Sequence, residues 1–156
     1  MSLLLFFACE FSYAQQSATE LNQQELMKKF IGSWQVTPAK DTIGGIQFET
    51  YGKACIASDF VIIKGVKTLT DRWLIGYSKA DDNFRMFGLY ESGGYVTRTA
   101  SFVSENKFVQ LMVRDFDTSR VYGSVELVLD TPASMTAKFL DADGNVTGEA
   151  ILVKSE

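Results

Sequence analysis

The chain has 156 residues, of which 46% are hydrophobic and 22% charged, with a formal net charge of −4 and no histidine. This length and composition predict one globular domain with a real core. The acidic balance argues against nucleic acid and anionic membranes as partners, because both require a basic surface. The lack of histidine excludes a histidine-ligated haem, Ser-His-Asp triads, Cys-His pairs and ordinary zinc sites, so no cofactor is expected.

The N-terminal segment is typical of a secretion signal. Residues 3–8 are an apolar run too short to span a bilayer, and Ser12-Tyr13-Ala14 places small residues at a cleavage site. We therefore expect residues 1–14 to be a signal and residues 15–156 to form one secreted or periplasmic domain. No lysine or arginine precedes the apolar run, so a buried N-terminal strand is the alternative interpretation.

The two cysteines have different expected roles. Cys9 follows Phe6-Phe7-Ala8, a loose match to a lipoprotein signal, so lipid attachment at Cys9 is a minor alternative to cleavage after Ala14. Cleavage after Ala14 leaves Cys55 alone, and a single cysteine forms no internal disulfide. Cys55 lies in a strand pattern, and we interpret it as a small buried hydrophobe rather than a nucleophile.

A short amphipathic helix is predicted next. Ser17 and Glu20 fit a capping box, and apolar residues continue at helical spacing to Ile31. The helix is expected from about residue 19 to residue 30, with Gly32 ending it. Because a helix of this length is marginal alone, we expect it to cover one end of a barrel.

From Trp34 onward the hydrophobic period changes to two, which indicates strands. We predict strands near residues 33–37, 46–56, 59–67, 70–78, 84–91, 95–102, 107–114, 120–129, 134–140 and 146–153. The links are short and carry turn residues, so neighbouring strands should pair antiparallel. Closing such a meander removes both edges. The prediction is an all-β, up-and-down antiparallel barrel of about ten strands with a short N-terminal helix, and residues 38–45 as its longest loop.

The segment Lys29-Phe30-Ile31-Gly32-Ser33-Trp34 resembles the Gly-x-Trp entry of the calycins, the superfamily of lipocalins and fatty-acid-binding proteins. The chain is most similar to bacterial calycin-like families of unknown function, which also carry segments like residues 71–78 and Ser92-Gly93-Gly94. The likeness covers roughly residues 20–153. It implies structural roles for Gly32 and Trp34, with the tryptophan closing one end of the barrel beside a late arginine or lysine.

Several basic residues are candidates for that cation or for a ligand site. The resemblance suggests Arg114 or Arg120 as the cation beside the tryptophan. A hairpin around residues 103–107 would pair Phe102 with Phe108. This pairing would place arginines and aromatic residues together on one face of these strands, which we call the mixed face. The opposite face would carry apolar residues alone. The candidate ligand-binding residues of the mixed face are Arg98, Arg114, Arg120 and Tyr122.

Two orientations of these strands are open. In the first, the apolar face points inward and the arginines lie in water, because buried charge is costly unless it is paired. In the second, the mixed face points inward and binds a carboxylate. Arg120-Val121-Tyr122 resembles the Arg-x-Tyr pair that holds the head group in fatty-acid-binding proteins, although there the pair lies on the last strand. A register slip of one residue would exchange the two orientations.

Three aromatic residues and one acidic segment are further candidates for a site. Trp73, Tyr77 and Phe87 come from neighbouring strands and are expected to share a face, either as core or as a ligand-lining wall. The acidic segment 141–145 invites a calcium interpretation, but its spacing departs from an EF-hand loop. Asp-Gly and Gly-Asn are typical of hairpin turns, so we predict a turn there.

Three classes of function follow from the predicted barrel. The first is non-covalent binding of a small apolar or amphipathic molecule, including one that carries a carboxylate. The second is a structural or protein-interaction module with a filled barrel, which a large exposed apolar patch would favour. The third is a cyclase or isomerase type of enzyme, which a cavity carboxylate with a raised pKa beside an aromatic wall would favour.

Overall fold

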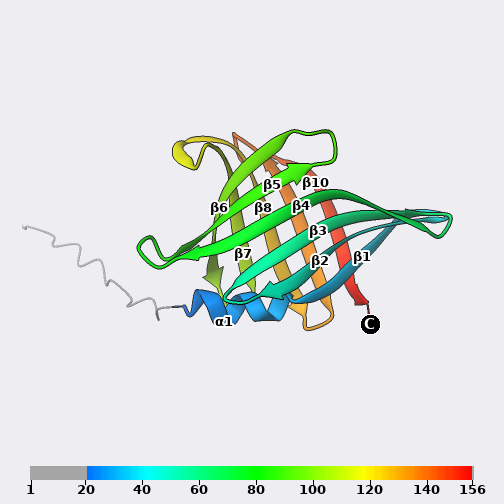
Figure 1. Cartoon of the computed structure of the whole chain (residues 1–156). Coiled ribbons are helices and arrows are strands. Elements are labelled where there is room, and N and C mark those ends of the chain that lie inside the picture. The colour runs from blue at the N-terminus through cyan, green and yellow to red at the C-terminus, as the bar shows by residue number, and fades with distance from the viewer. Residues whose placement is uncertain (1–20, 156) are drawn as a thin grey trace, which may run out of the picture.

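Ten strands form a closed barrel, with one short helix across its end (Figure 1). The computed structural model describes residues 21–155. The helical segments are α1 (Gln23–Met27) and the 3-10 turn η1 (Lys28–Phe30). The strands are β1 (Gly32–Ala39), β2 (Thr42–Tyr51), β3 (Ala54–Ile63), β4 (Val66–Ser78), β5 (Asn83–Tyr90), β6 (Tyr95–Ser104), β7 (Lys107–Arg114), β8 (Asp117–Thr131), β9 (Ser134–Asp141) and β10 (Val146–Ser155).

The strand order confirms the predicted meander. Every strand pairs antiparallel with its sequence neighbours, and the first strand closes on the last through Trp34 opposite Lys154. The alternation of the strands then puts one side chain in two inside the barrel. An all-β, up-and-down closed barrel with a short N-terminal helix is therefore established.

The helix is shorter than predicted. Asn22 is its N-cap, and the Asn22 side chain accepts a hydrogen bond of 3.2 Å from the backbone N–H of Glu25. Such a cap satisfies one of the unpaired N–H groups of the first turn. The predicted signal at residues 1–14, Cys9 and the capping box of Ser17 and Glu20 lie outside the described residues.

The predicted boundaries between residues 38 and 69 are wrong. The chain turns at Gly52 and again at Lys64-Gly65, where all three residues have positive φ, so residues 57–58 lie inside a strand. Positive φ at both central residues matches a tight hairpin turn. The predicted loop at 38–45 is also mostly strand, with a sharp turn at Asp41. Figure 1 shows the hairpins of β1–β2 and β3–β4 reaching beyond the barrel.

Gly45 explains part of that error, because it reads as a loop residue but lies in a strand. A Cβ atom built at Gly45 would lie 2.4 Å from the carbonyl oxygen of Trp34 and 2.6 Å from the ring of Phe60. Glycine is required by close packing here and does not mark a turn. The acidic segment 141–145 is a hairpin turn as predicted, and the Asp141 carboxylate accepts hydrogen bonds from the backbone N–H groups of Asp143 and Asn145.

Aromatic side chains fill the end of the barrel that the helix covers. The Phe30 ring has no exposed surface and lies 6.1, 5.6 and 5.9 Å from the rings of Phe48, Phe102 and Phe108. Phe84 packs edge-on against Phe108 at 5.7 Å. The helix therefore joins the core through Phe30, which explains how so short a helix is held.

Trp34 closes the same end of the barrel. Its side chain is fully buried, and its indole N–H donates a 2.8 Å hydrogen bond to the carbonyl of Phe30. The ammonium of Lys154 lies 5.1 Å from the ring centroid. The suggested cations, Arg114 and Arg120, do not occupy that position. Closure of the barrel pairs β1 with β10, so the last strand supplies the cation.

Gln23 fastens the helix to the rim of the barrel, and it provides a first prediction. Its amide donates to the Phe102 carbonyl at 3.1 Å and accepts from the Phe102 N–H at 2.7 Å. Replacing Gln23 by Met leaves both buried backbone groups unpaired, so we expect the free energy of unfolding to fall by about 2–3 kcal/mol. Urea unfolding measures this loss of free energy. The control is Gln24→Met, because Gln24 is exposed. Equal stability of the two variants would contradict this anchoring role.

Candidate functional site

A cavity of about 230 Å³ occupies the interior of the barrel beyond the aromatic end. It is larger than the roughly 150 Å³ apolar cavity that accepts benzene and below the 300–1,000 Å³ of drug-sized sites. Most of its wall is apolar, with three polar side chains. The lining residues are Val36, Gly45, Ile46, Phe48, Ala57, Asp59, Trp73, Met86, Arg98, Gln110, Val125, Leu127, Met135, Ala137, Phe139, Ala150 and Leu152.

Arg98 is the central polar residue of this wall. It lies on β6, and its guanidinium stacks over the Trp73 ring at 4.0 Å from the centroid. Its Nη1 donates a 2.6 Å hydrogen bond to Oε1 of Gln110 on β7. Its Nε is buried and has no hydrogen-bond partner within the described residues. A buried cation with an unpaired N–H donor is energetically costly unless a ligand accepts a hydrogen bond from that donor.

Asp59 and Asp71 form a carboxyl pair beside the same tryptophan. They are direct cross-strand partners on β3 and β4, next to a bulge between Asp59 and Phe60. The Trp73 indole N–H donates a 3.1 Å hydrogen bond to Oδ2 of Asp59. Like charges directly opposite each other destabilise a sheet, and bulges that redirect side chains are frequent next to active sites. The pair therefore marks this wall as a candidate site.

The environment changes the acid–base properties of the pair. Burial, together with the neighbouring Asp71 carboxylate, raises the pKa of Asp59 to about 6, although the Trp73 hydrogen bond opposes this. Burial also raises the pKa of Asp71 and lowers that of Arg98. Two carboxyls in this arrangement titrate as a unit that readily holds one proton. Near neutral pH the site thus combines a proton-exchanging carboxyl with a fixed cation.

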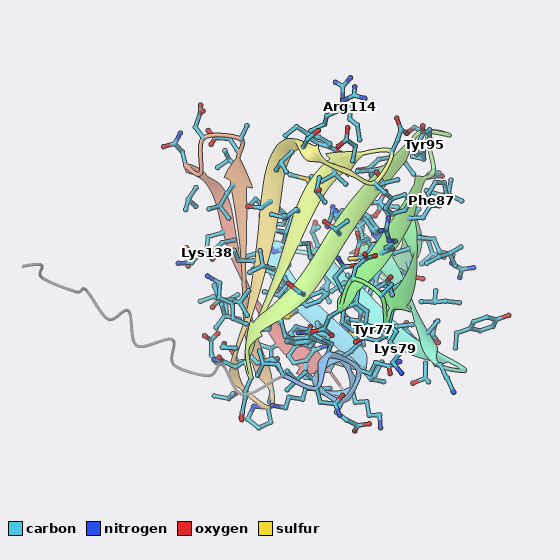
Figure 2. All side chains as sticks on the ribbon, turned by 90° about the vertical axis from the view of Figure 1, so that its left-hand side faces the viewer. Tyr77, Lys79, Phe87, Tyr95, Arg114 and Lys138 are labelled. Atoms are coloured by element: carbon cyan, nitrogen blue, oxygen red, sulfur yellow. The ribbon has the colours of Figure 1, made fainter. Side chains whose placement is uncertain are left out.

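The three predicted aromatic residues do not share a face. Trp73 points inward and lines the cavity. Tyr77 lies on the same side of β4, where its ring packs on Phe84 at 5.4 Å and its hydroxyl hydrogen-bonds Asp82. Phe87 pairs with Leu74 on the outer face and stacks on Tyr95 at 5.5 Å, pointing away from the barrel (Figure 2). Of the three, the cavity wall therefore contains only Trp73.

The predicted pairing of Phe102 with Phe108 is confirmed. Each of the two predicted orientations is correct for only some of the strands. The mixed face of β6 and β7 points inward, which brings Arg98 into the cavity. Bulges beside Val113 then shift β8, so its apolar residues face the same interior. The sequence pattern could not reveal these bulges, which lie beside the turn at residues 115–116, where both residues have positive φ.

The other mixed-face candidates lie outside the cavity. Arg114 and Arg120 are exposed, and Figure 2 shows Arg114 at the tip of its hairpin, pointing away from the barrel. Tyr122 is 44% exposed, but it lies near enough to Arg98 to raise the pKa of the guanidinium slightly, against the larger lowering by burial. The Arg-x-Tyr resemblance therefore does not yield a head-group site, since Arg120 is not brought to the cavity.

Asp59, Asp71 and Gln110 were missed as site residues. Cys55, Ala57 and Asp59 are spaced two residues apart, so a continuous strand places the carboxylate on the same face as two apolar residues. This spacing can be read from the sequence. It was lost because a strand break was expected at residues 57–58, where the strand in fact continues. An acidic residue in the buried phase of a continuous strand is the pattern that could have found the site.

Comparisons with known proteins add no family to this picture. A scan against models of protein families finds no match, and no curated protein matches the sequence. Among residues 21–155, no three Cys, Asp or Glu side chains gather in a way that could hold a metal ion. In that same part of the chain, neither helical segment has the length and apolar character needed to cross a membrane.

Proposed function

We propose that this protein is a calycin-like barrel that binds a small amphipathic molecule without covalent attachment. The observation that carries the proposal is the cavity, whose apolar wall is interrupted by Arg98 with one buried donor unpaired. Binding sites of this kind are mostly apolar with a few polar groups that orient the ligand. The apolar body would lie against the wall, and an oxygen-bearing head group, carboxylate or carbonyl, would lie at Arg98.

The cavity also weighs against the alternative of a filled barrel. Met135, Ala137 and Leu152 are buried, but they leave open space of about 230 Å³ in front of them. Protein interiors are normally packed with few voids larger than a water molecule. A barrel built only for structure would be expected to close this space with larger side chains.

Calorimetric titration with cyclohexanecarboxylate and cyclohexanone tests the proposal, since both have a compact apolar body and one head group. We expect saturable binding that Arg98→Met weakens at least about tenfold, because hydrogen bonds to a charged group contribute about 1.5–3 kcal/mol. Arg72→Met, exposed on the same barrel, is the matched control and should bind like the wild type. The proposal would be overturned if neither probe bound and if protein purified from its source had the mass of the chain alone, with no bound ligand.

Filling the cavity gives an independent prediction. Ala137→Leu places a larger side chain in the open space, so probe binding should be lost. The free energy of unfolding should stay equal or rise, since each buried methylene contributes about 0.8 kcal/mol. Ala39→Leu, at an exposed strand position, is the control that should leave binding unchanged. Unaltered binding by Ala137→Leu would place the ligand elsewhere.

We also propose that the protein works in a secreted or periplasmic setting, on the basis of the signal-like residues 1–14. The intact mass of protein recovered from the cell envelope tests this. A chain that begins at Gln15 supports it, a lipid adduct on Cys9 supports the anchored alternative, and a chain that retains residues 1–14 contradicts both.

A further inference from the structure

We propose that the barrel is an acid–base catalyst, in which Asp59 moves a proton within a small enolisable carbonyl compound while Arg98 stabilises the oxyanion. This inference rests on the proposed function, because the substrate would occupy the same cavity. The polar groups of the wall are more elaborate than binding alone requires. A single cation would hold a head group, but this wall also contains the carboxyl of Asp59, whose cross-strand partner is the carboxyl of Asp71.

The geometry brings a base and an oxyanion stabiliser to one aromatic ring. Asp59 accepts from the indole N–H of Trp73 at 3.1 Å, while Arg98 lies over the face of that ring at 4.0 Å. Both Asp59 and Arg98 line the cavity. The Trp73 hydrogen bond fixes one oxygen of Asp59, and the Gln110 hydrogen bond fixes Arg98. A carbonyl compound in the cavity can therefore meet a positioned base and a positioned cation together.

The step that this arrangement supports is a proton shift. The Asp59 carboxylate takes a proton from the carbon beside the carbonyl, so the C–H bond breaks and an O–H bond forms on Asp59. The electron pair of the broken bond moves into the new C=C bond, and the carbonyl oxygen becomes an enolate held by Arg98. In a substrate whose existing C=C bond joins the β and γ carbons, Asp59 then returns the proton to the γ carbon. The enolate electrons re-form the carbonyl, and the remaining C=C bond joins the α and β carbons. Atoms and electrons balance, and no oxidant or reductant is needed.

Asp71 is a positioning residue in this scheme. The ionisable groups around Asp59 are Asp71 on β4, Tyr90 on β5 and Arg98 on β6. Asp71 is the one among them that disfavours the charged form of Asp59 most, because its carboxylate lies directly opposite. Catalysis by the Asp59 carboxylate should rise with pH through a midpoint near 6, the pKa of this carboxyl. Removing the Asp71 charge should move that midpoint to lower pH.

The unconjugated isomer of cyclohexenone is the test substrate, because its conversion to the conjugated isomer reports both removal and return of the proton. Proton NMR of the full-length protein with this compound in deuterated buffer follows two readouts in one sample. Line broadening of the substrate reports binding, and the new vinyl signals report conversion. We expect conversion by the wild type and a loss of at least about 100-fold in Asp59→Asn, whose amide cannot act as a base.

Three further measurements decide the outcome. Asp59→Asn should still broaden the substrate signals, and Asp143→Asn, an exposed turn variant, should convert at the wild-type rate. Asp71→Asn should remain active with its pH midpoint lowered, a readout that a merely structural role would not move. Binding without conversion by the wild type overturns this inference and leaves the proposed function standing. Absence of binding of this compound also overturns the inference, while the proposed function stands or falls with the calorimetric probes. Conversion by Asp59→Asn at the wild-type rate likewise overturns the inference.

Discussion

Trp34→Ala is expected to lower the free energy of unfolding by about 3–5 kcal/mol, the range for removal of a large buried aromatic side chain. The Trp34 side chain is completely buried where the barrel closes, and its N–H holds the carbonyl of Phe30 at 2.8 Å. The substitution leaves a cavity and an unpaired carbonyl at the junction of helix, first strand and last strand. Urea unfolding followed by circular dichroism measures the change.

Lys154→Met separates packing from charge at this junction. The methionine keeps an apolar stem beside the ring and removes only the ammonium, which lies 5.1 Å from the Trp34 centroid. A cation–π contact of this kind contributes about 0.5–2 kcal/mol. We therefore expect Lys154→Met to cost less than Trp34→Ala. Equal costs would show that the cation, and not the buried ring, stabilises the closure.

The start of the barrel after the helix is a part of the fold that the sequence could predict. Gly32 and Trp34 stand between a helical and a period-two pattern, which indicates where the barrel begins. Gly32 has φ of +127°, a backbone conformation that residues with a side chain rarely adopt, so glycine is strongly favoured there. The identity of the cation was not predictable, because it depends on which residue of the last strand lies opposite after closure.

The candidate site was predicted less well than the fold, for a physical reason. Alternation assigns faces only while the register is unbroken, and one bulge inverts the faces of everything after it. Arg98 precedes the bulges at Val113 and lies where the mixed-face orientation placed it, whereas Arg120 follows them and is exposed. Asp59 was missed because a strand break was predicted at residues 57–58, directly before it.

Asp59→Asn is expected to stabilise the protein by up to about 3 kcal/mol at pH 7 to 8. In the folded state the pKa of Asp59 is about 6, against an ordinary value of 3.8. Between these values the folded chain keeps a proton that the unfolded chain has released. Stability is therefore lost as pH rises through this window. The size follows from about 1.36 kcal/mol per pKa unit. Asparagine avoids the loss, and its amide oxygen can still accept from Trp73.

The pH dependence makes this prediction specific. The difference between Asp59→Asn and the wild type should shrink as pH falls and disappear below about pH 4, where both side chains are neutral. Asp143→Asn, in an exposed turn, should show no comparable stabilisation. Thermal unfolding from pH 4 to pH 8 measures all three chains. A less stable Asp59→Asn at pH 7 would mean that the carboxylate stabilises the fold, for example through Arg98. A more stable one would mean that the chain keeps a destabilising charge at its cavity, as expected where function and not folding requires the group.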